Sequence, residues 1–127
     1  MIDFLCETFA AVETERITRP DGSIGHVELQ IGDSILMLSE AGAEFPAGRS
    51  AHYVFVEDVD STYERALGAG GSSLRPPSNQ FYGNREAGIR DALGNIWWIA
   101  TVIEEVPGKE LQGRWEQSQQ APTVDHA

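Results

Sequence analysis

Residues 90–101 read Arg-Asp-Ala-Leu-Gly-Asn-Ile-Trp-Trp-Ile-Ala-Thr, a turn followed by an apolar strand, and this stretch decides the fold. An earlier stretch, residues 31–39, reads Ile-Gly-Asp-Ser-Ile-Leu-Met-Leu-Ser and has the same order of a glycine turn and an apolar strand. The two turn glycines are Gly32 and Gly94. Because a pattern that recurs along the chain indicates a repeated structural unit, the sequence predicts two related modules.

The elements that lead to each apolar strand also recur. Helical spacing of apolar residues predicts a helix at 2–10, and alternation predicts a hairpin at 12–18 and 24–31 before the strand at 34–39. The second module is predicted as a strand, a helix and three strands, at 52–56, 59–67, 72–75, 85–90 and 96–100. One domain over 1–127 is expected, with module one at 1–42, module two at 50–102, and a tail at 103–127 that contains a short helix. The first module thus lacks the opening strand that the second module has.

Charge and composition exclude several partners. Nine Lys and Arg against twenty Asp and Glu give a formal charge of -11, which is the wrong sign for neutralising nucleic-acid phosphates. The same acidic charge would favour a cationic ligand over an anionic one. No apolar stretch is long enough to cross a bilayer, and Cys6 is the only cysteine, so we expect no membrane span, no intramolecular disulfide and a cytoplasmic location.

The ordered motifs resemble those of the vicinal-oxygen-chelate superfamily (glyoxalase, bleomycin resistance, dioxygenase), in the branch often called PhnB-like. The motifs are Gly25-His26-Val27-Glu28-Leu29, Ile31-Gly32-Asp33-Ser34, Val56-Glu57-Asp58-Val59-Asp60, Arg90-Asp91-Ala92-Leu93-Gly94-Asn95 and Trp97-Trp98-Ile99-Ala100-Thr101. The resemblance implies an α+β fold of paired βαβββ modules around a shared cleft. It also implies that the first strand of module one is either missing or supplied by the tail or a partner chain. The resemblance favours a homodimer.

The resemblance places the metal-ligand positions of the superfamily on residues that cannot bind a metal. Those positions fall on Trp98 in the second module, on Leu36 in the first, and on Ala51 at the start of the second. The neighbouring His52 would point to the opposite face of its strand. We therefore expect no metal and no cofactor, and binding rather than catalysis.

Strand alternation then predicts which side chains line the cleft. The predicted cleft residues are Tyr53, Phe55, Leu36, Leu38 and Trp98, joined by His26, Glu28, Glu86, Phe81 and Tyr82. Ile35 and Met37, like Val54, Val56, Trp97 and Ile99, would instead pack beneath the helices. An aromatic cleft with a few polar groups suits a flat organic molecule, so the sequence predicts a metal-free protein that sequesters such a ligand.

Several alternatives stay open at this point. Trp98 would either stack on a ligand or fill the cleft, and Phe81 and Tyr82 would form a lid or simply anchor their loop. Glu86 would offer a carboxylate to a cationic ligand or be a solvated strand residue. His26 and Glu28 would form a proton-transfer pair or face solvent. The alternative functions are accordingly a metal-dependent or acid-base enzyme of the superfamily and an interaction module with a filled cleft.

Overall fold

The computed structural model describes residues 1–120, and residues 121–127 of the tail lie outside the described part. In chain order the elements are α1 (Ile2–Phe9), β1 (Val12–Thr18), β2 (Ile24–Ile31), β3 (Ser34–Leu38), β4 (Ala51–Phe55), α2 (Val59–Gly68), β5 (Ser72–Asn79), β6 (Asn84–Arg90), β7 (Ile96–Val102) and α3 (Gly108–Gln120). No helix in the described residues is both long enough and apolar enough to span a membrane.

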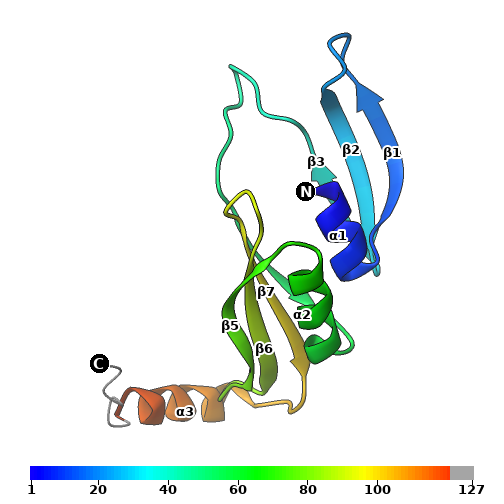
Figure 1. Cartoon of the computed structure of the whole chain (residues 1–127). Coiled ribbons are helices and arrows are strands. Elements are labelled where there is room, and N and C mark those ends of the chain that lie inside the picture. The colour runs from blue at the N-terminus through cyan, green and yellow to red at the C-terminus, as the bar shows by residue number, and fades with distance from the viewer. Residues whose placement is uncertain (121–127) are drawn as a thin grey trace.

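The strands form two separate sheets, one in each module (Figure 1). The first sheet has the order β1-β2-β3 and the second the order β4-β7-β6-β5. In the second sheet β4 runs parallel to β7, whereas the other pairs are antiparallel. The expected α+β fold with a βαβββ second module is therefore confirmed. In the first sheet β2 is the central strand, so β1 and β3 are the outer strands.

One strand is longer than the sequence predicts. The expected strand ended at Arg75 because two prolines follow, but β5 continues through Pro76 and Pro77 to Asn79. It lies at the edge of its sheet, where a missing N–H breaks no central ladder. Its register with β6 shifts between Ser73 and Arg75 and again between Arg75 and Ser78, and the second shift spans the two prolines.

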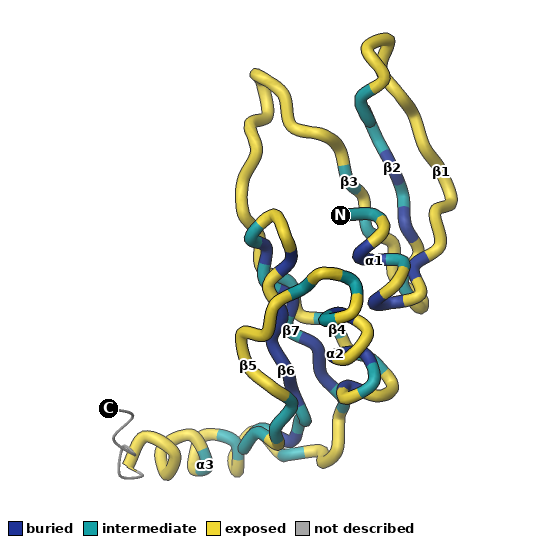
Figure 2. Tube along the Cα trace, in the orientation of Figure 1, coloured by how far each residue is buried: buried dark blue, intermediate teal, exposed yellow. Residues whose placement is uncertain are grey.

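The core lies between the helices α1 and α2 and one face of each sheet (Figure 2). Trp97 of β7 is its largest fully buried side chain and contacts both modules. Its ring centroid lies 6.3 Å from that of Phe4 and 5.7 Å from that of Phe9, both on α1. His52, the partner of Trp97 on β4, stacks on it with ring centroids 4.3 Å apart, as expected for a histidine that points toward the helices. Trp97 thus holds α1 against the second sheet.

The turn before β7 is built around a buried carboxylate. Asp91 accepts hydrogen bonds from the backbone N–H groups of Leu93 at 2.9 Å and Asn95 at 3.0 Å, and from the indole Nε1–H of Trp97 at 2.9 Å. Burial raises the pKa of Asp91, but the hydrogen bonds from Trp97, Asn95 and Leu93 outweigh it and hold the pKa below its ordinary value. Asp91 therefore fixes the start of β7 and the position of Trp97.

The prediction for the first apolar strand was wrong about which face it presents. Leu36 pairs with Leu29, and Leu38 with Val27, and these residues pack on the core. Ile35 and Met37, expected beneath the helices, are instead 61% and 60% exposed. Cross-strand partners in an antiparallel pair point to the same side of the sheet, so the buried residues of β2 set the direction for β3.

Candidate functional site

The second sheet carries aromatic side chains on the side away from α2, and we call this side the aromatic face. Tyr53 and Phe55 of β4 are both exposed there, Phe55 to 62%. Trp98 is the cross-strand partner of Tyr53 and lies beside it. Because Val54 and Val56 turn the other way into the core, the alternation of β4 divides the strand into a core side and an aromatic side. This division of the second module agrees with the sequence-based expectation.

Trp98 lies over a glycine that leaves room for its ring. Gly88 is its partner on β6, and a Cβ atom placed there would meet the six-membered ring of the indole at 2.6 Å from Cζ3. Only glycine permits this close approach of the ring to the sheet. Arg75, the partner of Gly88 on β5, places its guanidinium carbon 5.2 Å from the ring centroid. The residues Tyr53, Trp98, Gly88 and Arg75 therefore form one row across all four strands.

Glu86 lies beside this row and is buried, so of the two alternatives left open for it the solvated strand residue was wrong. Only 3% of the residue is exposed. Its Oε2 accepts hydrogen bonds from the hydroxyl of Tyr53 at 2.5 Å and from the hydroxyl of Tyr82 at 2.6 Å. Asn84 donates to the Tyr53 hydroxyl at 2.9 Å. The other carboxylate oxygen, Oε1, lies 3.6 Å from Nη1 of Arg75. A buried charge is thus held by two phenols and faces one cation.

The two tyrosines stay protonated in this arrangement. Burial and the hydrogen bond to the Glu86 carboxylate raise the pKa of Tyr53 and, more strongly, that of Tyr82. A phenolate beside a carboxylate would place two negative charges together, which is why the neutral form is favoured. Both hydroxyls therefore act as permanent donors that fix the orientation of Glu86.

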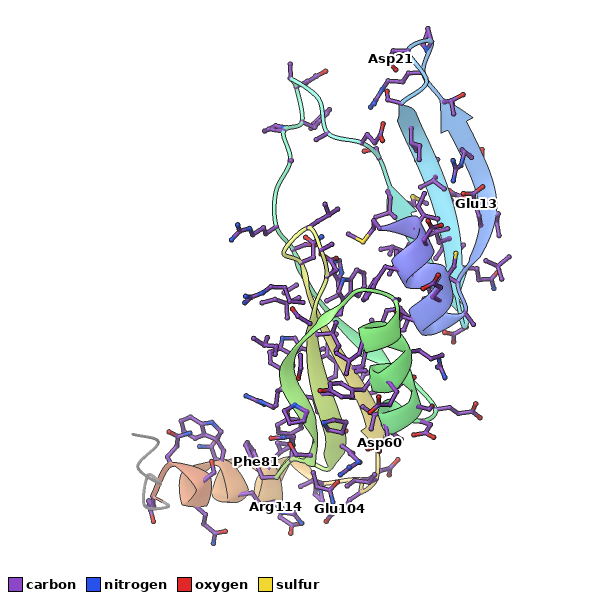
Figure 3. The ribbon with its side chains drawn as sticks, viewed as in Figure 1. Glu13, Asp21, Asp60, Phe81, Glu104 and Arg114 are labelled. Atoms are coloured by element: carbon purple, nitrogen blue, oxygen red, sulfur yellow. The ribbon has the colours of Figure 1, made fainter. Side chains whose placement is uncertain are left out.

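The loop before β6 is held in place from the C-terminal side, at the foot of the second sheet (Figure 3). Arg114 of α3 donates to the carbonyl oxygen of Phe81 at 3.0 Å and pairs with Glu104 at 2.7 Å. Gly83 has a φ of 92°, and its carbonyl accepts hydrogen bonds from the N–H groups of Ile103 and Glu104. Phe81 contacts Tyr82 edge to face, with ring centroids 5.0 Å apart. These contacts favour the anchor interpretation of the loop over a lid.

His26 and Glu28 lie on the other sheet. Nε2 of His26 is 3.3 Å from Oε1 of Glu28, and both side chains are partly buried on the side of β2 opposite Val27 and Leu29. Met37 of β3 pairs with Glu28, so it shares their side. The sequence placed the pair in one cleft with the aromatic residues, but within a single chain the two groups occupy different sheets.

Two grooves lie along the outer strand β3. One, of about 730 Å³, lies between β3 and β4 and includes Ile35, Tyr53 and Phe55. The other, of about 820 Å³, lies between Leu38 and the loop around Phe45. Neither of these two grooves is lined by Glu86 or Trp98.

The residues of this chain do not fit the metal site of the superfamily. The indole of Trp98 and the methyl group of Ala51 occupy the aromatic face where ligands would be needed, and Leu36 points into the core. Within residues 1–120 no three His, Cys, Asp or Glu side chains converge on a possible metal position. Glu86 is the one acidic side chain in the row of residues around Trp98, and its Oε2 already accepts hydrogen bonds from the hydroxyls of Tyr53 and Tyr82. A metal-free protein stays a prediction.

Some site residues were not found from the sequence. Arg75, Gly88 and Asn84 contact the predicted residues Trp98, Tyr53 and Glu86, yet none belongs to a motif. Their positions follow from the register of β5, β6 and β7, which a single sequence does not specify.

Comparison with known proteins places the chain in a family. Residues 1–99 match the Glyoxalase/Bleomycin resistance protein/Dioxygenase superfamily, and the chain belongs to it. The uncharacterized protein Mb0911c of Mycobacterium bovis is 30% identical over 122 residues, which cover 87% of this chain and 80% of that protein. The PhnB-like branch stays a prediction.

Solved structures show the same fold. TioX from Micromonospora sp. ML1 is 26% identical, with a TM-score of 0.63 over 80% of this chain and 86% of its own. TnmS3, an antibiotic binding protein from Streptomyces sp. CB03234, is 22% identical, with a TM-score of 0.62 over 79% of this chain and 82% of its own. A glyoxalase-related enzyme from Fulvimarina pelagi is 23% identical, with a TM-score of 0.61 over 78% of this chain and 76% of its own.

Proposed function

We propose that the chain binds a flat aromatic small molecule on its aromatic face and sequesters it without chemical change. The observation that carries this proposal is the position of Trp98, which lies over Gly88 in a row with Tyr53. Aromatic rings gain stacking energy from such surfaces, and the hydroxyls and carboxylate nearby would fix the orientation of a ligand. The fold is compatible with this role, because it also serves the antibiotic binding protein TnmS3.

A second copy of the chain would complete the site. The aromatic face is open on one side, and the first sheet presents its own exposed apolar side chains on β1 and β3, namely Ile17, Ile35 and Met37. Soluble monomers rarely expose large apolar surfaces of this kind. We therefore propose a homodimer in which the first sheet of one protomer faces the aromatic face of its partner. His26 and Glu28 would then approach the ligand from the partner's side.

Two tryptophans make a matched test of the proposal. Trp98→Ala removes the ring of the aromatic face, whereas Trp115→Ala removes a half-exposed ring on α3, outside this face. Titration of the purified protein with naphthamide, a neutral flat aromatic compound, is followed by isothermal calorimetry. The proposal predicts that Trp98→Ala weakens binding about ten-fold or more and that Trp115→Ala does not. Equal binding by both variants would refute it.

Acid-base catalysis is a second candidate, favoured by one observation. The 3.3 Å separation between His26 and Glu28 is close to hydrogen-bond length, and a carboxylate beside an imidazole supports proton transfer near neutral pH. In that case His26→Gln would abolish turnover of a substrate. The expected cytoplasmic location stays a prediction for either function.

A further inference from the structure

Arg75 occupies the position that a ligand cation would take. Its guanidinium is a planar cation, and it lies over the indole of Trp98 and faces the buried carboxylate of Glu86. A flat face below and a fixed negative charge beside it are the two features that recognise a planar cation. The chain therefore fills this position with one of its own side chains.

The contacts of Arg75 are weak enough to be exchanged. Its Nη1 is 3.6 Å from Oε1 of Glu86, which is beyond ordinary hydrogen-bond length, and 49% of its side chain is exposed. It comes from the edge strand β5, whose register is irregular on both sides of it. Ion pairs that are half open to water contribute little to stability, so a competing cation has little to overcome.

The carboxylate, by contrast, is fixed. Glu86 is buried on the central part of the sheet, and the hydroxyls of Tyr53 and Tyr82 both donate to its Oε2. This leaves Oε1 free of a hydrogen bond from any described side chain and directed toward the guanidinium. A carboxylate oxygen that accepts no hydrogen bond from a side chain gains most from a donor that also carries positive charge.

We infer that the aromatic face is specific for planar aromatic cations of the amidine or guanidine class, which displace Arg75 from Trp98 and donate hydrogen bonds to Glu86. This inference rests on the proposed function, because it uses the same aromatic face. An anion would have to approach the buried carboxylate and is disfavoured, as it also is by the net charge of -11.

Three compounds of one shape provide the probes: naphthamidine is a cation, naphthamide is neutral and naphthoate is an anion. Calorimetry gives the dissociation constant of each for the wild-type protein and for Arg75→Met and Glu86→Gln. Wild-type protein should prefer naphthamidine to naphthamide by about ten-fold, the size of effect that a charged hydrogen bond supplies. Arg75→Met removes the competing cation and should raise this preference about three-fold or more. Glu86→Gln should abolish it, with thermal unfolding used to confirm that the variant folds.

The outcomes separate the cation inference from the proposed function. Equal binding of naphthamidine and naphthamide, both weakened by Trp98→Ala, would overturn the cation inference and leave aromatic binding standing. A preference for naphthoate that disappears in Arg75→Met would overturn it as well, and would make Arg75 an anion-binding residue. If none of the three compounds binds, both the inference and the proposed function fail. Because Arg75 is half exposed, Arg75→Met should fold even if Glu86→Gln does not. A weaker preference of Arg75→Met than of the wild type for naphthamidine over naphthamide would also refute the inference.

Discussion

Replacing Gly88 by alanine should disturb Trp98 specifically. The added Cβ would lie 2.6 Å from Cζ3, 3.0 Å from Cε3 and 3.2 Å from Cη2 of the indole, whereas carbon atoms normally rest about 3.5 to 4.0 Å apart. The ring must therefore move outward by about 1 Å, because β6 is held between β5 and β7 and cannot withdraw. The new methyl group thus changes the binding surface without removing an aromatic residue.

The size of the effect follows from two opposing contributions. Overpacking costs about 1 to 3 kcal/mol, and the loss of glycine from the unfolded chain returns about 0.4 to 1 kcal/mol. We expect Gly88→Ala to lower the free energy of unfolding by about 1 kcal/mol and to weaken naphthamide binding about ten-fold. Urea denaturation and calorimetry measure the two quantities.

A second glycine provides the control. Gly68 is the last residue of α2, and a Cβ added there would meet no atom within 4 Å beyond its chain neighbours and the backbone of its own helix, so Gly68→Ala should leave binding unchanged and keep or slightly raise stability. If Gly88→Ala behaves like Gly68→Ala in both assays, the described contact between Gly88 and Trp98 is wrong.

Three further predictions concern stability and the loop. Asp91→Asn should cost about 1 to 3 kcal/mol at neutral pH, because the Asp91 carboxylate accepts hydrogen bonds from four donor groups, two backbone and two side-chain. The pKa of Asp91 is lower in the folded than in the unfolded protein, so ionised Asp91 stabilises the fold above the unfolded pKa near 4, and this stabilisation is lost as the pH falls through the folded pKa. Urea denaturation at several pH values should therefore show the stabilities of the wild type and Asp91→Asn converging in acid. Thr8→Val should raise stability by about 1 kcal/mol in urea denaturation, because the buried hydroxyl of Thr8 is the one buried side-chain polar atom without a partner in residues 1–120. Arg114→Ala should lower global stability by less than about 1 kcal/mol yet speed amide exchange in the loop at residues 80–83, and unchanged exchange there would show that α3 does not hold the loop.

Much of the fold could be predicted because helix caps and strand alternation depend on residues that are close together in the sequence. The helix that ends at Gly68 begins at the expected cap, Asp58, whose carboxylate accepts from the N–H groups of Asp60 and Ser61. Tyr53 and Trp98 reach the predicted side because β4 and β7 alternate cleanly. What a single sequence did not specify is register, and for that reason Arg75 and Gly88 were missed and β3 was assigned the wrong face.

The solvated-strand alternative for Glu86 failed for a different reason. A glutamate in a strand is usually exposed, because burying a carboxylate is costly unless partners satisfy it. Those partners, Tyr53 and Tyr82, are distant in the chain or lie on a loop, so alternation alone could not show them. Once the hydrogen bonds are seen, burial of Glu86 indicates a built polar site rather than a solvated face.

The three tryptophan side chains also report directly on ligand position. Trp97 is buried and donates its indole N–H to Asp91, Trp98 lies on the aromatic face, and Trp115 is on α3. The most direct measurement is a two-dimensional ¹H–¹⁵N NMR titration with naphthamide that follows the three indole N–H resonances. The proposed function predicts a saturable shift of the Trp98 resonance while those of Trp97 and Trp115 stay in place. A saturable shift of Trp115 alone, or no shift of any of the three, would contradict it.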